Sequence, residues 1–396
     1  MNGMLGFRWI AQHAGAPDAP AYRNAADELH GFRGEPLLAL PKPDTTLPQP
    51  SPALKAYVDS WVAKRGKGRA VVMVHGFAFD PSAADDDPGN ADDPYNGVYA
   101  NPSVSGRESW LPIVGETDEA GAVLQDIAVA FCWTSIGSMR QYGTACWSNL
   151  YQYPVFDLAP LASKALAAVI RTLVEAGVPV DVFAHSLGTR TATGAIRLLA
   201  DNGFPDAVRR ALLVGGAQFS VDARDALAGT QTDVFSFASQ SDPVLAWGGV
   251  TGCHPFREVA TQEARVIGRD GMQATPHWID LQVDRSPARQ GGAFNAWFRA
   301  RYGATLSDDP DARGRHWAYY RQPGNRVILA RMLTEEGLTP QGMREAGAID
   351  GVVRAGGYGG LTAPVPPTPT TCAARSNPQN LMVAGAADAT SNLVVG

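Results

Sequence analysis

Residues 180–190 read VDVFAHSLGTR, and the rest of the chain is organised around this stretch. Its apolar, β-branched opening predicts a buried strand, and the segment 191–200 that follows is compatible with a helix. Ser186 stands between them, with Ala184 two residues before it and Gly188 two residues after it. Small residues there allow strand and helix to close on each other across a tight, strained turn. The stretch therefore predicts a turn that presents the Ser186 hydroxyl at the carboxyl end of a sheet.

The pattern of small residues around this serine is weak evidence when taken alone. At average residue usages it arises by chance in roughly one chain in four of this length. Glycine is also the commoner residue at the position of Ala184. The strand before it and the helix after it strengthen the prediction, and the other elements of the chain decide it.

Apolar runs typical of buried strands alternate along the chain with segments of helical spacing. The expected strands are 70–75, 127–133, the run from 180, 211–214, 233–238 and 278–283, with an earlier one near 5–10. The expected helices are 52–65 with Ser51 as its N-cap, 158–175, 191–200 and 325–334. This alternation predicts an α/β protein with a mostly parallel, doubly wound sheet and helices on both faces.

The composition divides the chain into three parts. Residues 1–50 are rich in Pro, Ala and Gly and are expected to form an irregular leader. The α/β domain is expected over 51–353, with long loop insertions at about 78–119 and 284–315, the first of them running over the surface. Residues 354–396 are Gly-rich and then Pro/Thr-rich, which is typical of a flexible tail.

Charge and hydropathy exclude some partners. A formal net charge of −6 is mild for 396 residues and argues against binding to nucleic acid. No segment is apolar over enough residues to span a bilayer. The first ten residues lack a basic region followed by an apolar core, so we expect a cytoplasmic protein, with export by a non-standard route left open.

Cysteines and acidic residues give no metal-site spacing, and neither a metal nor a cofactor is expected. The four cysteines lack the C-x-x-C pattern; they are Cys132, Cys146, Cys253 and Cys372. Pairing of Cys132 with Cys146 is left open for an exported protein. The aspartates of the first insertion do not follow a calcium-loop spacing and read as a solvated loop; they are Asp80, Asp85, Asp86, Asp87, Asp92 and Asp93. No phosphate-binding loop of P-loop spacing is present.

A serine hydroxyl becomes a nucleophile only when a base takes its proton, and the base needs an acid to orient it. Asp242 stands in the turn after the strand 233–238, where an acid at the carboxyl end of the sheet belongs. The alternative for Asp242 is a structural role, because Asp-Pro is a common turn former and Pro243 follows it.

The position of each histidine along the chain selects the base. His185 flanks the serine and should point away from its hydroxyl, and His254 follows Asp242 too closely to lie beyond a later strand. His277 precedes the strand 278–283, at its amino end and so on the wrong side of the sheet. His316 comes after the last expected strand and before the closing helix. We therefore predict His316 as the base, with His277 as its main competitor.

The oxyanion that forms on acyl transfer needs two backbone N–H donors. One is expected from Leu187, directly after the serine, and the other from Phe77 in the sequence His75-Gly76-Phe77. A simple strand-ending turn is the alternative for the second segment. Several aromatic residues could line an apolar acyl pocket, although each is individually more typical of a core; they are Trp110, Trp133, Trp147, Phe156 and Trp247.

On these residues the chain resembles the α/β-hydrolase superfamily, from about Ala70 to Leu333. It is particularly similar to a bacterial branch with a Trp-x-Ser-x-Gly segment before the elbow helix. That segment is WTSIG at 133–137, followed by Tyr142. The resemblance implies an α/β-hydrolase fold in which Ser186 is the nucleophile, His316 the base and Asp242 the acid.

The resemblance also implies an activity, the hydrolysis of a small to medium carboxylic ester or lipid through an acyl-serine. The chain departs from the branch at 216–219, where GAQF replaces an apolar-Pro-Asp stretch, and in the length of both insertions. These departures concern the choice of substrate. The alternatives are a binding or scaffold protein that keeps the fold without turnover, and acyl transfer or amide hydrolysis by the same triad.

Overall fold

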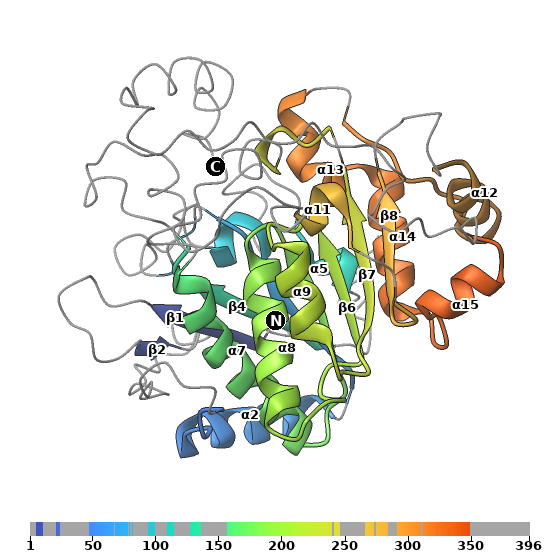
Figure 1. Cartoon of the computed structure of the whole chain (residues 1–396). Coiled ribbons are helices and arrows are strands. Elements are labelled where there is room, and N and C mark those ends of the chain that lie inside the picture. Colours follow the sequence, from blue (N-terminus) through green and yellow to red (C-terminus); the bar gives the residue numbers. More distant parts are fainter. Residues whose placement is uncertain are drawn as a thin grey trace, which may run out of the picture.

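A computed structural model describes residues 5–10, 21–23, 47–66, 68–77, 79, 81, 94–99, 109–114, 127–135, 157–239, 241–245, 266–272, 275–283, 291–309 and 312–348. Within these ranges, eight strands form one sheet in the order β2-β1-β4-β3-β5-β6-β7-β8 (Figure 1). The strands are β1 Leu5–Ile10, β2 Ala21–Arg23, β3 Ala70–Val74, β4 Ile127–Trp133, β5 Val180–His185, β6 Arg210–Val214, β7 Asp233–Ala238 and β8 Trp278–Gln282. All are parallel to their neighbours except the outermost strand β2, which is antiparallel to β1. The expected α/β class with a mostly parallel sheet is confirmed.

The helices of the described ranges are α2 Pro52–Arg65, α5 Leu111–Val114, α7 Asp157–Glu175, α8 Gly188–Asp201, α9 Ser220–Leu227, α11 Ile267–Asp270, α12 Gly291–Tyr302, α13 Ala318–Arg321, α14 Pro323–Thr334 and α15 Pro340–Glu345, with a π-helical turn η1 Tyr95–Tyr99 and a 3-10 helix η4 Ala312–Trp317. The four helices predicted from spacing are α2, α7, α8 and α14. Ser51 caps α2 as predicted, because its hydroxyl accepts the N–H of Leu54 at 3.1 Å.

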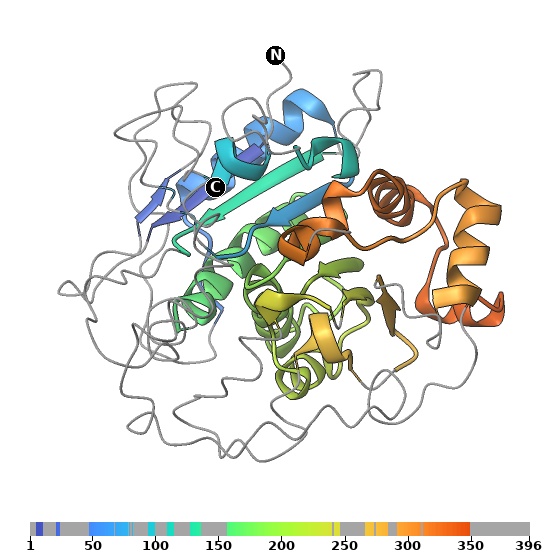
Figure 2. The same cartoon turned by 90° about the horizontal axis from the view of Figure 1, so that it is seen from above.

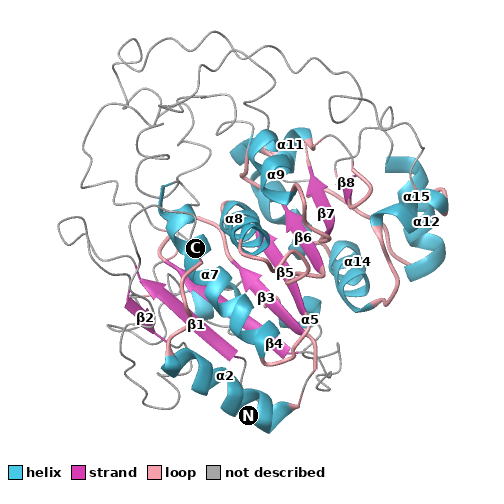
Figure 3. Cartoon of the chain, turned by 60° about the horizontal axis from the view of Figure 1, so that its bottom comes forward, coloured by secondary structure: helices cyan, strands magenta, loops and turns pink. Residues whose placement is uncertain are grey.

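The strands bury both faces of the sheet, as continuous apolar runs predict. On one face, Val72 and Val182 pack with α2, α7 and α8; on the other, Met73 and Phe183 pack with Trp110, α12 and α14. Figure 2 shows the green helices α7 and α8 and the orange helices α12–α14 on opposite sides of the sheet. Figure 3 shows α2, α7 and α8 covering the near face.

The leader and the two loop insertions, all expected as irregular, contain regular elements where they are described. The leader contributes both β1, at the predicted position, and the three-residue strand β2, which is too short to give a periodic signal. In the first insertion, η1 and α5 are buried rather than spread over the surface, because Tyr99 and Trp110 pack fully into the core. The second insertion contains α12, whose Phe294 and Phe298 are one helical turn apart and fully buried. The predicted tail 354–396 lies outside the described residues.

The order of the strands determines where the chain can build a site. After β3 the chain moves to β4 on one side, and after β5 it moves to β6 on the other. The carboxyl ends of β3 and β5 therefore form a topological switch point, where open α/β sheets bind ligands. His75-Gly76-Phe77 follows β3 there, and Ser186 follows β5. Among the described helices, none is long and apolar enough to cross a membrane.

Candidate active site

Ser186 adopts the strained conformation that the sequence predicts for a serine between strand and helix. Its φ of 53° makes it the one non-glycine residue with positive φ in the described part of the chain. The backbone around it holds this conformation: its N–H donates to Val214 O at 3.0 Å, and its carbonyl accepts the Thr189 hydroxyl at 2.7 Å and the Ala217 N–H at 3.0 Å. Ala217 belongs to the stretch 216–219, so this stretch braces the turn.

Two glycines bring the loop after β3 against the serine. A Cβ on Gly76 would lie 2.7 Å from the Cβ of Ser186 and 3.3 Å from its Oγ. A Cβ on Gly188 would lie 2.3 Å from His75 O and 2.4 Å from Val74 O. The sequence predicted that residue 188 must be small because α8 approaches its own strand. In the structure, a Cβ at this position would instead meet the carbonyls that end β3.

Substitution of Gly188 by alanine should therefore destabilise the fold strongly. The added methyl group meets backbone on two sides, which cannot move aside by changing a rotamer, and we expect a loss of about 3 kcal/mol or more in the free energy of unfolding. Urea denaturation measures it. The matched control is Gly203→Ala, just beyond the other end of α8, where φ is +89° but nothing lies within 4 Å of a Cβ. Its cost should be about 1–2 kcal/mol; equal costs for both variants would refute the close packing.

Asp242 lies in the turn after β7 and is fully buried. Its two carboxylate oxygens contact different partners. Oδ1 accepts the N–H groups of Val244 and Leu245 at 2.9 and 3.0 Å and so forms the turn. Oδ2 is 2.7 Å from Nδ1 of His316, with the Tyr319 hydroxyl at 3.4 Å. The turn-forming role and the role beside a histidine, which the sequence left as alternatives, are both present.

His316 lies in η4 and is 4 % exposed. Its Nε2 is 3.0 Å from Oγ of Ser186, while Nδ1 contacts Asp242. A carboxylate can only accept, so the proton of a neutral imidazole resides on Nδ1 and the lone pair of Nε2 faces the serine hydroxyl. Ser186, His316 and Asp242 thus form one hydrogen-bonded chain, in the geometry that allows the imidazole to take the serine proton.

His277 and His185 lie as their sequence positions predict. His277 is half-exposed, with Nδ1 2.9 Å from Oδ1 of Asp233, the first residue of β7, and so lies at the amino end of the sheet. His185 points away from the serine hydroxyl: its Nε2–H donates to the carbonyl of His316 at 2.9 Å, and the two rings are 4.8 Å apart. His185 therefore helps to hold His316. His254 lies outside the described residues.

His75 ties the loop after β3 to β4. Its Nε2 accepts the backbone N–H of Trp133 at 2.9 Å, so Nδ1 carries the proton and donates to Gly76 O at 2.9 Å. The Trp133 indole N–H donates to His75 O at 2.9 Å, and the two rings are stacked. The Tyr99 hydroxyl accepts the His75 N–H at 2.8 Å. Burial lowers the pKa of His75 from 6.5 to about 3, against the opposing effect of its bond to Gly76, so the ring is neutral.

Trp133 and Ser135 of the WTSIG segment both act on this loop. The Ser135 hydroxyl accepts the N–H of Phe79 at 3.1 Å, and the Ser135 N–H donates to Phe79 O at 2.9 Å. Two residues of one segment thereby anchor both ends of 75–79. The sequence singled out Trp133 as an acyl-pocket candidate and gave no role to Ser135 or Tyr99. These roles depend on contacts between residues 24 to 58 positions apart, which local spacing does not encode.

Several further predicted residues are placed in the core or lie beyond the described ranges. Trp110, a candidate for the acyl pocket, is fully buried against Tyr99, Phe183 and Tyr320, and Trp133 is also fully buried. Cys132 is buried in β4. The candidates outside the described ranges are Trp147, Phe156, Trp247, Cys146, Cys253, Cys372 and the six aspartates of 80–93.

The described residues contain no group of three or more His, Cys, Asp or Glu side chains that could hold a metal ion. Comparison with family models, with curated proteins and with solved structures found no match for this chain.

Proposed function

We propose that this chain is a serine hydrolase of the α/β-hydrolase fold, which cleaves a carboxylic ester through an acyl-enzyme on Ser186. The observation that carries the proposal is the chain of two hydrogen bonds from Ser186 Oγ to His316 and from His316 to Asp242, at 3.0 and 2.7 Å. All three residues are buried, with at most 4 % of each exposed. A binding protein has no need for a strained serine, an oriented imidazole and a buried carboxylate in this order.

The location and order of these residues support the same proposal. The serine follows a central strand, the acid follows a later strand, and the base follows the last strand, which is the chain order Ser, Asp, His of the α/β-hydrolases. All three lie beyond the carboxyl ends of the parallel strands, near the switch point between β3 and β5.

The reaction follows from the proton positions. His316 Nε2 takes the proton of Ser186 as Oγ attacks the ester carbonyl carbon, and Asp242 stays ionised and stabilises the imidazolium. His316 then returns the proton to the leaving alkoxide oxygen as the C–O bond breaks, which leaves the acyl-serine. Water, deprotonated by the same Nε2, attacks the acyl carbon and releases the carboxylic acid and the free serine.

The negative charge of each tetrahedral intermediate is assigned to two backbone amides. The Leu187 N–H stands at the N-terminus of α8, where the helix dipole favours an anion. The Phe77 amide directly follows Gly76, whose close approach to Ser186 brings the loop within reach of the reacting carbon. The anchoring of 75–79 by Trp133 and Ser135 then keeps this donor in position, which is the preorganisation that oxyanion stabilisation requires.

The test combines turnover with covalent labelling. A series of p-nitrophenyl esters from acetate to palmitate should be hydrolysed, and the preferred chain length measures the acyl pocket. A fluorophosphonate probe should label the folded protein at Ser186, located by mass spectrometry, and should not label protein unfolded in urea. Added alcohol or amine that diverts the acyl group would identify acyl transfer. Neither turnover nor labelling would refute the proposal and favour a binding protein.

A further inference from the structure

We propose that Asp308 is a positioning residue, which clamps the turn that carries Asp242 to the segment that carries His316. The inference rests on the proposed function. It addresses a difference between the two residues: Asp242 stands in the turn directly after the strand β7, whereas His316 lies in η4, and the element described before η4 is the helix α12. The two are separated by 74 positions in the chain, so their 2.7 Å contact requires a tertiary tie.

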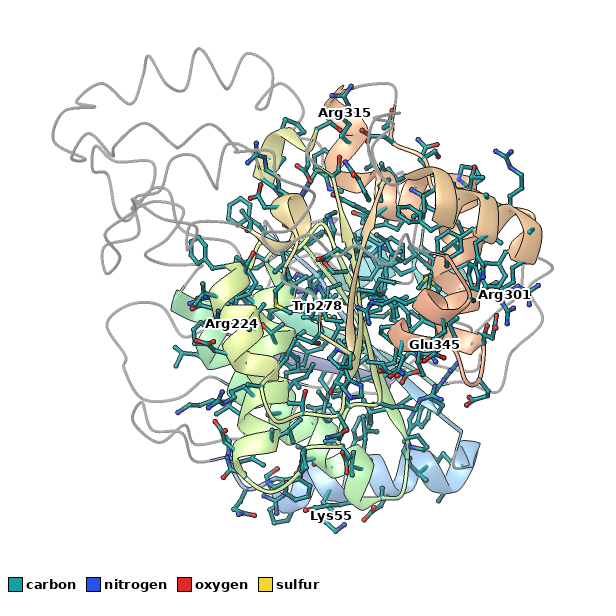
Figure 4. All side chains as sticks on the ribbon, turned by 45° about the vertical axis from the view of Figure 1, so that its right-hand side comes forward. Lys55, Arg224, Trp278, Arg301, Arg315 and Glu345 are labelled. Atoms are coloured by element: carbon teal, nitrogen blue, oxygen red, sulfur yellow. The ribbon has the colours of Figure 1, made fainter. Side chains whose placement is uncertain are left out.

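Asp308 contacts the residue before the acid and the residue before the base. Its Oδ2 accepts the hydroxyl of Ser241, which also lies 2.9 Å from the Ser239 hydroxyl. The same Oδ2 is 3.6 Å from Nε of Arg315. The Asp308 side chain is only 10 % exposed, so its charge is poorly solvated and depends on these partners. In Figure 4 Arg315 lies at the upper edge of the ribbon, beside the carboxyl ends of the strands.

The loop that carries Asp308 is itself fixed by two asparagines. Asn295 of α12 accepts the N–H of Leu306 at 2.7 Å. Asn325 of α14, which is 1 % exposed, accepts the N–H of Ser307 at 2.8 Å and donates to its carbonyl at 2.8 Å. Because Leu306 and Ser307, the two residues before Asp308, are hydrogen-bonded to helices, the carboxylate of Asp308 is a fixed point. Contacts to a fixed point restrain the acid turn and the base segment relative to each other.

Loss of this restraint should lower the catalytic rate and leave substrate binding almost unchanged. Displacement of a catalytic group by about 1 Å can cost about 100-fold in rate. We expect Asp308→Ala to lower kcat by roughly 10- to 100-fold with KM changed less than about twofold. Asp308→Asn keeps an oxygen that can accept the Ser241 hydroxyl, and its kcat should be within a few-fold of wild type.

The deciding experiment is a double-mutant cycle with His316→Ala, measured on the best p-nitrophenyl ester. If Asp308 acts by positioning the imidazole, Asp308→Ala should change the residual rate of His316→Ala by less than about twofold. The control is Asp233→Asn, which removes the carboxylate charge paired with His277 at the far end of the sheet and should leave kcat unchanged. Should Asp308→Ala fail to fold, Asp308→Asn and Ser241→Ala enter the same cycle, each with a kcat a few-fold below wild type.

The outcomes separate the two proposals. A wild type without turnover overturns the proposed function, and the positioning role with it. A wild type that depends on His316 but tolerates folded Asp308→Ala with unchanged kcat overturns only the positioning role. An equal loss of rate from Asp308→Ala in the presence and in the absence of His316 also overturns only the positioning role.

Discussion

Replacing Ser186 or His316 by alanine is expected to lower kcat for ester hydrolysis by about 10⁶-fold, and replacing both should lower it no further. The serine attacks only while Nε2 of His316 takes its proton, at the observed 3.0 Å, so either substitution removes the same step. The residual rate that remains comes from the oxyanion donors and from substrate binding. Steady-state kinetics of the two single variants and the double variant measure this non-additivity.

The matched control is His277→Ala, which removes the histidine that competes with His316 in the sequence. Since His277 contacts Asp233 at the amino end of β7, this variant should retain the wild-type kcat. Loss of activity in His277→Ala with activity retained in His316→Ala would show that the base is misassigned. Loss in neither would refute the triad.

Acidification is expected to destabilise the protein through His75. The pKa of His75 in the folded protein, about 3, lies below the ordinary value of 6.5. Between these two pH values the ring is protonated in the unfolded chain and neutral in the folded protein. The stability from the neutral ring is fully present above about pH 6.5 and is lost as the pH falls toward 3. From pH 6.5 to 4 this amounts to about 3 kcal/mol, at 1.36 kcal/mol per pH unit.

Urea denaturation as a function of pH tests this with two variants. His75→Asn cannot titrate and should be less stable than wild type near pH 7.5, with the difference shrinking by about 3 kcal/mol toward pH 4. Tyr99→Phe removes the hydroxyl that accepts the backbone N–H of His75 and leaves the imidazole unchanged. This variant should lower the free energy of unfolding by about 1–2 kcal/mol equally at every pH. A constant difference between wild type and His75→Asn would mean that the ring is not held neutral.

The secondary structure near the site could be predicted because its signals are local. Strands β3, β4 and β7 and helix α7 match their predicted bounds to within one residue, since continuous apolar runs and helical spacing are properties of neighbouring residues. β2 was missed because three residues carry no period. The segments at 94–99 and 109–114 were expected on the surface because their neighbours are polar, yet Tyr99 and Trp110 are buried.

The features of the site likewise divide into those that local sequence pattern predicts and those that depend on tertiary contacts. The strained serine, the two glycines, and the order in which Ser186, Asp242 and His316 follow their strands are all predicted from local pattern. What holds these residues is visible only in the folded chain: the backbone of β3 against Gly188, the carbonyl of His316 on His185, and the carboxylate of Asp308 between acid and base. All three contacts join residues that are between 67 and 131 positions apart in the chain. Local pattern specifies which element forms, whereas contacts at such separations exist only after the sheet has brought the elements together.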